Sequence, residues 1–285
     1  MILIADSGST KTDWRLIEGK KNIHQFSTIG FSPYFQDSDT IAEEIKGNLL
    51  PGIKALSLDE QDEMEIYFYG TGCSSEEKCE VVHRAIRQNF PNSIIEVEHD
   101  LLGAARALCG ENEGIAAILG TGSNSCYYDG NKIIENIASL GFILGDEGSG
   151  AYMGKVFIQD YLNKEQPLSI SERFYERFKL SKEDILNAVY KKPLPNKFLA
   201  SFTKFIFQNK NEQYIINLVI DCFDKFFIKH ICKYTNYKEV KMSCVGSVGY
   251  YFSDTLHAVA SNRNVLIDKI IESPIASLTL YHIGE

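Results

Sequence analysis

The chain of 285 residues has no run of about 18 uninterrupted apolar residues, the length that a membrane-spanning helix needs. Its first residues lack a basic region followed by an apolar run and a cleavage site, so we expect no signal peptide and a cytoplasmic location. Basic residues are in deficit, with 29 Lys and Arg against 38 Asp and Glu. The resulting formal charge of −9 argues against a surface for nucleic acid or anionic membranes.

The cysteines also lack a pattern that would indicate a metal site or a disulfide framework. There are 7 of them, an odd number, and none forms a C-x-x-C pair. Scattered cysteines without a signal peptide are typical of free, mostly buried thiols in a reducing compartment. The hydrophobic content of 44% and the charged content of 24% are those of an ordinary globular protein with one large or two medium domains.

The expected strands and helices follow an order that occurs twice. The first copy predicts strands at 2–5, 12–18, 22–29, 66–69 and 94–97, and helices at 38–50, from 74 and from 100. The second copy starts with strands at 115–119, 124–129 and 131–138. The fold class is therefore α/β.

Three pairs of segments resemble each other in the same order along the chain. ADSGSTKT matches LGTGSNS, YGTGCSSEEK matches VGSVGYYFSD, and EVEHDLLGAARAL matches LIDKIIESPIASLTL. These matches predict a duplicated unit, with domains at 1–109 and 110–285 that enclose a cleft. Residues 150–238 are expected to form a helical insertion in the second domain, and the aromatic side chains between 174 and 207 to belong to its core.

A glycine-rich turn follows the first strand of each copy. Backbone amides in such turns suit phosphate oxygens, and glycine lets the chain approach a ligand closely. Ser9, Thr10 and Lys11 would add hydroxyl and ammonium donors. The carboxylate of Asp6 would repel phosphate by itself, so we expect it beside a magnesium ion, directly or through water. The alternative is that both segments are simple hairpin turns.

Two familiar nucleotide motifs are excluded by these turns. Neither turn matches the P-loop pattern G-x-x-x-x-G-K-[ST]. A strand, not a helix, follows each turn, so the context of a dinucleotide-binding fingerprint is missing as well.

Two acidic positions are candidates for catalysis or substrate binding. Asp100 begins a helix directly after a strand, where it would be either a functional carboxylate or a helix cap. His99 beside it is interpreted as a structural or exposed histidine. Asp146 and Glu147 lie between glycines, which indicates either a helix N-terminus that favours acids or a loop that approaches a ligand.

These segments together resemble a known family. DSGSTKTDW, LGTGSNS and VGSVG resemble the two phosphate motifs and the adenosine motif of the sugar kinase, actin and heat-shock chaperone ATPase superfamily. GFILGDEGSGAYMG closely resembles a segment of the N-acetylglucosamine kinases and their bacterial relatives in the BadF/BadG/BcrA/BcrD ATPase group. The resemblance implies two ribonuclease H-like domains of the actin-like ATPase fold and phosphorylation of N-acetylglucosamine on its 6-hydroxyl, with ATP and Mg²⁺ and as a possible homodimer.

The resemblance also implies roles for individual residues. Asp100 matches the catalytic base, and Asp6 lies near magnesium. The residues expected to bind ATP are Asp6, Gly8, Ser9, Thr10, Lys11, Thr121, Gly122, Ser123, Gly246 and Ser247. The residues expected to bind the sugar are Ser32, Asp100, Asp146 and Glu147. Ser32 stands where the family places an asparagine, so its side chain is shorter and has no amide.

Two other functions remain open at this point. An ATPase that activates a CoA-ester dehydratase or reductase needs paired cysteines for a shared iron–sulfur cluster, and GDEGSGAYMG has none at the comparable place. A non-catalytic sugar or nucleotide sensor would lack turnover. An assay of ATP consumption distinguishes the kinase from the sensor.

Overall fold

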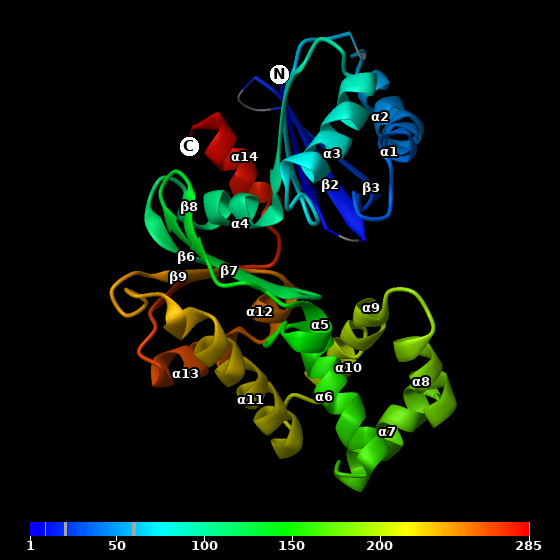
Figure 1. The fold of residues 1–285 in the computed structure, drawn as a ribbon, viewed down its shortest axis with the longest axis vertical. Helices are drawn as coiled ribbons and strands as arrows, with labels where there is room; N and C mark the ends of the chain where they lie inside the picture. Colours follow the sequence, from blue (N-terminus) through cyan, green and yellow to red (C-terminus); the bar gives the residue numbers. More distant parts are fainter. Residues whose placement is uncertain (9, 20–21, 59–60, 285) are drawn as a thin grey trace. The chain divides into compact units, whose positions relative to one another are not determined.

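The computed structural model describes residues 1–8, 10–19, 22–58 and 61–284, so the candidate residue Ser9 lies outside the described residues. The chain forms two compact units, each described here by itself (Figure 1). Unit 1 consists of Met1–Glu111, Gly130–Lys132 and Pro274–Glu285. Unit 2 consists of Asn112–Asp129 and Ile133–Ser273.

Unit 1 is built on a mixed sheet with the strand order β3-β2-β1-β4-β5. Its strands are β1 (Ile2–Ser7), β2 (Lys11–Glu18), β3 (Asn22–Ile29), β4 (Glu65–Gly70) and β5 (Ile94–His99). Its helices are α1 (Ser38–Glu44), α2 (Leu50–Lys54), α3 (Glu76–Asn89), α4 (Asp100–Cys109) and α14 (Ile275–Ile283). β1 and β2 are antiparallel, whereas β1, β4 and β5 run parallel, so the carboxyl ends of these three strands meet at one edge.

The helix predicted at 38–50 is longer and less regular than expected. α1 is followed by a π-helical segment, η1 (Ile45–Leu49), before α2 begins. Pro51 in the first turn of α2 has no backbone N–H to donate, and its ring crowds the carbonyl four residues earlier. The amide of Leu50 therefore bonds the carbonyl of Ile45, five residues back, which produces the wider turn.

Unit 2 repeats the sheet of unit 1 with the order β8-β7-β6-β9-β10. The strands are β6 (Glu113–Leu119), β7 (Ser123–Asp129), β8 (Ile133–Asn136), β9 (Met242–Val245) and β10 (Ile267–Ile271). Pairing of β6 is antiparallel with β7 and parallel with β9, as β1 pairs with β2 and β4. The predicted duplication is confirmed, although β8 is shorter than the strand expected at 131–138.

The helices of unit 2 lie mainly in the predicted insertion (Figure 1). They are α5 (Gly141–Leu144), α6 (Gly150–Asn163), α7 (Leu168–Phe178), α8 (Lys182–Tyr190), α9 (Pro195–Ala200), α10 (Thr203–Gln208), α11 (Gln213–Lys229), the 3₁₀ segment η2 (Ile231–Lys233), α12 (Ser247–Tyr251) and α13 (Ser253–Asn262). Within the residues described, none of the helices of the chain has the length and hydropathy of a membrane span.

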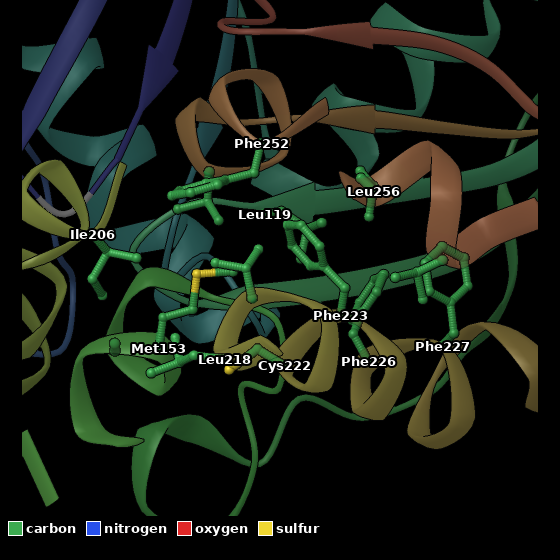
Figure 2. Close-up of a cluster of buried hydrophobic side chains, with 14 of the residues drawn as sticks. Leu119, Met153, Ile206, Leu218, Cys222, Phe223, Phe226, Phe227, Phe252 and Leu256 are labelled. Carbon is green, nitrogen blue, oxygen red and sulfur yellow. The ribbon is translucent and has the colours of Figure 1, made fainter. Parts of the chain in front are cut away.

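The insertion shares one hydrophobic core with the sheet of unit 2. Figure 2 shows Met153 of α6 and Phe223 and Phe226 of α11 gathered around Leu119, the last residue of β6. Phe174 and Phe202 are buried farther out, with ring centroids 5.3 Å apart in an edge-to-face arrangement. Most aromatic side chains between 174 and 207 are therefore core, as predicted, but Tyr175 and Tyr190 are exposed.

The C-terminal helix α14 belongs to unit 1, although the sequence predicts it within the second domain at 110–285. Its apolar residues Ile275 and Leu278 are buried against Ile4 and Ile17 of β1 and β2. The burial of this face on the first sheet, and not its place in the sequence repeat, decides where the helix lies.

Candidate functional site

The carboxyl edge of the parallel strands in unit 1 gathers the candidate acids. Ser7 of β1 is level with Gly70 of β4, and Gly70 is level with His99 of β5. The residues next to these strand ends include Asp6 and Asp100. This edge is where open α/β sheets bind ligands, because the loops after parallel strands converge there.

Asp100 is held through both of its carboxylate oxygens. The hydroxyl of Thr71 donates to Oδ2 at 2.6 Å, and Nδ1 of His99 lies 3.0 Å from Oδ1. Burial acts to raise the pKa of Asp100, but the bond and charge of His99, the Thr71 hydroxyl and the Leu101 amide hold the pKa below its ordinary value. A fifth of the Asp100 side chain (21%) is exposed, so a ligand can reach an ionised carboxylate.

The helix cap of α4 is His99 and not Asp100. The His99 ring accepts from the amide of Leu101 at 3.1 Å, and Asp100 is the first residue of the helix. Asp100 therefore occupies the first helical position and not the N-cap position, although the Leu101 amide also stabilises its charge. Its carboxylate instead points to Thr71 in the turn after β4, a contact across 29 residues that no local pattern in the sequence predicts.

Asp6 lies in a concentration of negative charge. Burial raises its pKa to about 7, and the charges of Asp100 and Asp13 act in the same direction. Lys11 is 2.6 Å from Asp13, so its ammonium group is engaged there. In the described part of the chain, no cluster of three or more His, Cys, Asp or Glu side chains is arranged to hold a metal ion.

The first glycine-rich turn is closed by backbone and hydroxyl hydrogen bonds. The amide of Gly8 donates to the carbonyl of Lys11 at 3.0 Å. The buried hydroxyls of Ser7 and Thr12 are 2.7 Å apart, and the Ser7 hydroxyl accepts from the amide of Phe31. Thr10 is exposed at the tip of the turn. A Cβ atom on Gly8 would make only ordinary contact, 3.7 Å from the Lys11 carbonyl, so internal packing does not require a glycine here.

Ser32 lies in a loop that is tied to the turn after β4. Its amide donates to the side chain of Gln36 at 2.7 Å, and its own side chain is half-buried. The hydroxyl of Tyr34 is 2.7 Å from that of Ser74, and Lys78 donates to the Pro33 carbonyl. The candidate sugar loop and the turn that holds Asp100 are therefore connected within unit 1.

The second glycine-rich turn is joined to the loop at 145–150 within unit 2. The amide of Gly150 donates to the Gly120 carbonyl at 2.9 Å, and the amide of Ala151 donates to the Thr121 carbonyl at 3.0 Å. A Cβ atom on Gly120 would meet nothing within 4 Å. The hydroxyl of Ser123 is buried and has no partner among the residues that the structure describes.

Asp146 lies directly against this turn. It has a positive φ of 55°, and its Oδ1 accepts from the hydroxyl of Ser139 at 2.6 Å. A Cβ atom on Gly122 would approach Oδ2 of Asp146 to 3.2 Å. The residue predicted to bind sugar and the residue predicted to bind phosphate are thus neighbours.

Glu147 turns away to a different partner. Its carboxylate is 3.2 Å from Nε2 of His230, and both side chains are buried. His230 follows α11, 83 residues along the chain, so the sequence gives no signal for this pair. Nδ1 of His230 is buried and has no partner within the described ranges.

Gly246 is required by a close approach inside unit 2. It has a φ of +124°, and a Cβ atom would lie 2.4 Å from the carbonyl oxygen of Leu119. Ser247, the first residue of α12, is exposed. The segment predicted to bind adenosine therefore abuts the end of β6, from which the second turn begins.

Comparison with known proteins gives matches among solved structures. No protein-family model matches the chain, and a search of curated proteins gives no significant match. A candidate N-acetylglucosamine kinase from Porphyromonas gingivalis is 41% identical, with 100% of this chain and 99% of that chain covered and a TM-score of 0.93. A candidate N-acetylglucosamine kinase from Chromobacterium violaceum is 16% identical over 98% of each chain, with a TM-score of 0.74.

A more distant similarity extends to the hexokinase of Schistosoma mansoni. It is 12% identical, covers 100% of this chain and 85% of that chain, and has a TM-score of 0.52. At such identities the similarity shows the fold alone, which is the α/β fold of sugar kinases and actin-like ATPases. The match to the Porphyromonas gingivalis protein spans the whole chain, and its identity is high enough to show that the two proteins belong to one family. The resemblance to the N-acetylglucosamine kinases that the sequence predicts is therefore confirmed. The chain belongs to the N-acetylglucosamine kinase family.

Proposed function

We propose that this protein transfers the γ-phosphate of ATP to a hydroxyl group of an amino sugar, with the 6-hydroxyl of N-acetylglucosamine as the expected acceptor. The observation that carries the proposal is the Asp100 carboxylate, held ionised by His99 and Thr71 at the carboxyl edge of parallel strands. The 41% identical relative is described as a candidate N-acetylglucosamine kinase, and sugar kinases use ATP.

Asp100 would accept the proton of the attacking hydroxyl. As the hydroxyl oxygen bonds to the γ-phosphorus, the bond from phosphorus to the bridging oxygen breaks, and ADP leaves with that electron pair. Phosphoryl transfer requires mainly positioning and stabilisation of charge, so a weakly basic carboxylate in the right place suffices. The lowered pKa of Asp100 keeps it able to accept a hydrogen bond at neutral pH.

The glycine-rich turns would bind the phosphates of ATP. Gly8 and Gly120 carry no side chain although the space beside each would admit one, which supports a role in ligand approach over internal packing. The unpartnered hydroxyl of Ser123 follows the second turn and is a further candidate donor among the described residues. Thr10, Lys11, Thr121 and Gly122 stay in the proposed set, and Gly246 and Ser247 would face the adenosine.

The residues around Asp6 fit a magnesium ion. Burial and the charges of Asp100 and Asp13 raise the pKa of Asp6, which indicates that this charge is incompletely balanced within the chain, although the described residues do not form a ready-made metal site. Magnesium is usually held by one or two carboxylates together with water and substrate phosphates, not by a full protein cage. A bound Mg²⁺ would supply stabilisation of the charge on the phosphates, and Asp6 would hold it directly or through water.

The sugar would be bound by Ser32 and Asp146 as well as by Asp100. Glu147 is already bonded to His230, so we assign it to holding the loop that carries Asp146. Ser32 offers a hydroxyl where the family has an asparagine, so the preferred acceptor is best decided by experiment. We further propose a cytoplasmic homodimer, and light scattering of the purified protein would test its dimeric state.

A coupled assay of ADP release tests the proposal. The acceptors are N-acetylglucosamine, glucosamine, N-acetylmannosamine, a muramic acid derivative and glucose, with a reaction lacking acceptor as the control. We expect release that depends on an amino sugar, and a product heavier by one phosphate in mass spectrometry. Release that is equal with and without every acceptor, or absent throughout, would contradict the proposal.

A further inference from the structure

The ring nitrogen Nδ1 of His99 lies within hydrogen-bond distance of two groups, one that needs a donor and one that needs an acceptor. It lies 3.0 Å from Oδ1 of Asp100 and 3.1 Å from the amide nitrogen of Leu101. A ring nitrogen carries either a proton or a lone pair. Capping the Leu101 amide needs the lone pair, whereas donation to the Asp100 carboxylate needs the proton.

The competition is resolved in favour of Asp100 when the ring is protonated. Burial acts to lower the pKa of His99, but the hydrogen bond and charge of Asp100 and the charge of Glu98 raise it above the ordinary value. The amide of Leu101 then has the Asp100 carboxylate itself as an acceptor. His99 is therefore more than a helix cap.

Thr71 fixes the other oxygen of the same carboxylate. Its hydroxyl donates to Oδ2 of Asp100 at 2.6 Å, and its amide donates to the carbonyl of Ser7 at 2.8 Å. The donor is thus anchored to the end of β1, while His99 is the last residue of β5. Thr71, anchored to the end of β1, and His99, at the end of β5, therefore hold the Asp100 carboxylate from two sides.

We propose that Thr71 and His99 are positioning residues for Asp100: by donating to its two oxygens, they fix the carboxylate plane and leave a lone pair free for the acceptor hydroxyl. This inference rests on the proposed kinase function. The inference gives Thr71 and His99 a role in the reaction that does not require contact with the substrate. It also explains why a carboxylate partly withdrawn from water stays ionised.

Other charged groups face this carboxylate. Asp6 on β1 and Asp100 repel each other. Burial raises the pKa of the Cys73 thiol after β4, and the charge of Asp100 raises it further. Glu98 on β5 acts on His99. Because neighbouring acids oppose the ionisation of Asp100, removing a donor should move its pKa upward.

A matched pair at position 71 tests the proposal. Thr71→Ser keeps the hydroxyl donor, whereas Thr71→Val keeps the shape and loses the donor. We expect kcat for the best amino sugar to fall about tenfold in Thr71→Val and to stay within about threefold in Thr71→Ser, since a hydrogen bond to a charged group carries an effect of at least this size. The acid limb of the pH profile of kcat should move to higher pH in Thr71→Val only.

A second pair separates positioning from capping by His99. His99→Phe removes Nδ1, and with it both the cap that the neutral ring provides and the donor that the protonated ring provides. Ser75→Ala removes only a cap, that of α3, where the Ser75 side chain accepts from the Lys78 amide. Both variants should melt at a lower temperature. Only His99→Phe should raise the pKa of Asp100, measured by NMR of ¹³C-labelled aspartate carboxylates.

The NMR titration does not require activity, so the inference and the proposed function fail separately. A wild type that phosphorylates no sugar refutes the function, and the pKa of Asp100 in the Thr71 and His99 variants still tests the positioning. An Asp100 pKa in Thr71→Val equal to that in Thr71→Ser, or in His99→Phe equal to that in Ser75→Ala, overturns the inference.

Discussion

The two sheets have the same strand order but carry different chemistry at their strand ends. In the alignment of the repeats, Gly120 of unit 2 takes the place of Asp6 of unit 1, and Ser273 takes the place of Asp100. Unit 1 therefore brings acids to its carboxyl edge, and unit 2 brings none from the same positions. The fold repeats, but the site does not.

The acids of the two units also differ in how they are balanced. In unit 1, burial and the neighbouring acids raise the pKa of Asp6 to about 7. A carboxyl group in such surroundings favours binding a cation or a proton. In unit 2, Glu147 is paired with His230, and Asp146 accepts from Ser139. The backbone amides of a glycine-rich turn suit phosphate groups, and the turn of unit 2 has no acid at the place of Asp6. The difference supports a division of labour, with proton acceptance in unit 1 and much of the nucleotide binding in unit 2.

The largest expected effect is on turnover and comes from Asp100→Asn. Asparagine keeps the shape but loses the basic oxygen, and general base catalysis usually contributes about 10² to 10⁴ in rate, so kcat should fall by that order. The matched change in unit 2, Ser273→Ala, should leave kcat within about twofold. Steady-state kinetics with the best amino sugar would decide. A folded Asp100→Asn protein that keeps a third or more of wild-type kcat would refute the catalytic role.

The second effect concerns stability and tests the pair that Glu147 and His230 form in unit 2. Glu147→Ala would leave His230 buried without its acceptor, so the free energy of unfolding should fall by about 1–3 kcal/mol. Glu147→Gln, which keeps an acceptor oxygen, should lose less. Denaturant unfolding of both variants measures this. If the two variants are equally stable, the His230 contact does not hold the loop.

The smallest effect is a dependence of stability on pH through Asp6. Its carboxyl has a pKa of about 7 in the folded protein against an ordinary value of 3.8, so the folded state binds more protons between these values and stability falls as pH rises through this range. In magnesium-free buffer, Asp6→Asn should therefore melt a few degrees above wild type at pH 8 and close to it at pH 4. Adding Mg²⁺ at pH 8 should stabilise wild type and not the variant. A constant difference across pH would show that Asp6 is not the group responsible.

The features that could be predicted from the sequence are those that depend on short segments of the chain. The strands, the glycine-rich turns and the acid after β5 follow from local apolar patterns and from the repeat, and the structure has them within a few residues. Thr71 acts through a contact across 29 residues and His230 through one across 83 residues, so local patterns could not assign them. His99 contacts the adjacent Asp100, but the ring geometry that makes this contact depends on the folded strand end. The burial of α14 on unit 1 likewise depends on which apolar face it meets, a property of the folded chain.

The division of labour between the units is tested most directly by calorimetry of magnesium–ATP binding to three variants. Gly120→Val adds a side chain where the structure has open space, and Gly47→Val does the same at a site remote in sequence from the turns. The account predicts that Gly120→Val weakens ATP binding about tenfold or more, while Gly47→Val and Asp100→Asn stay within about threefold of wild type. Unchanged affinity in Gly120→Val, or a loss as large in Asp100→Asn, would contradict it.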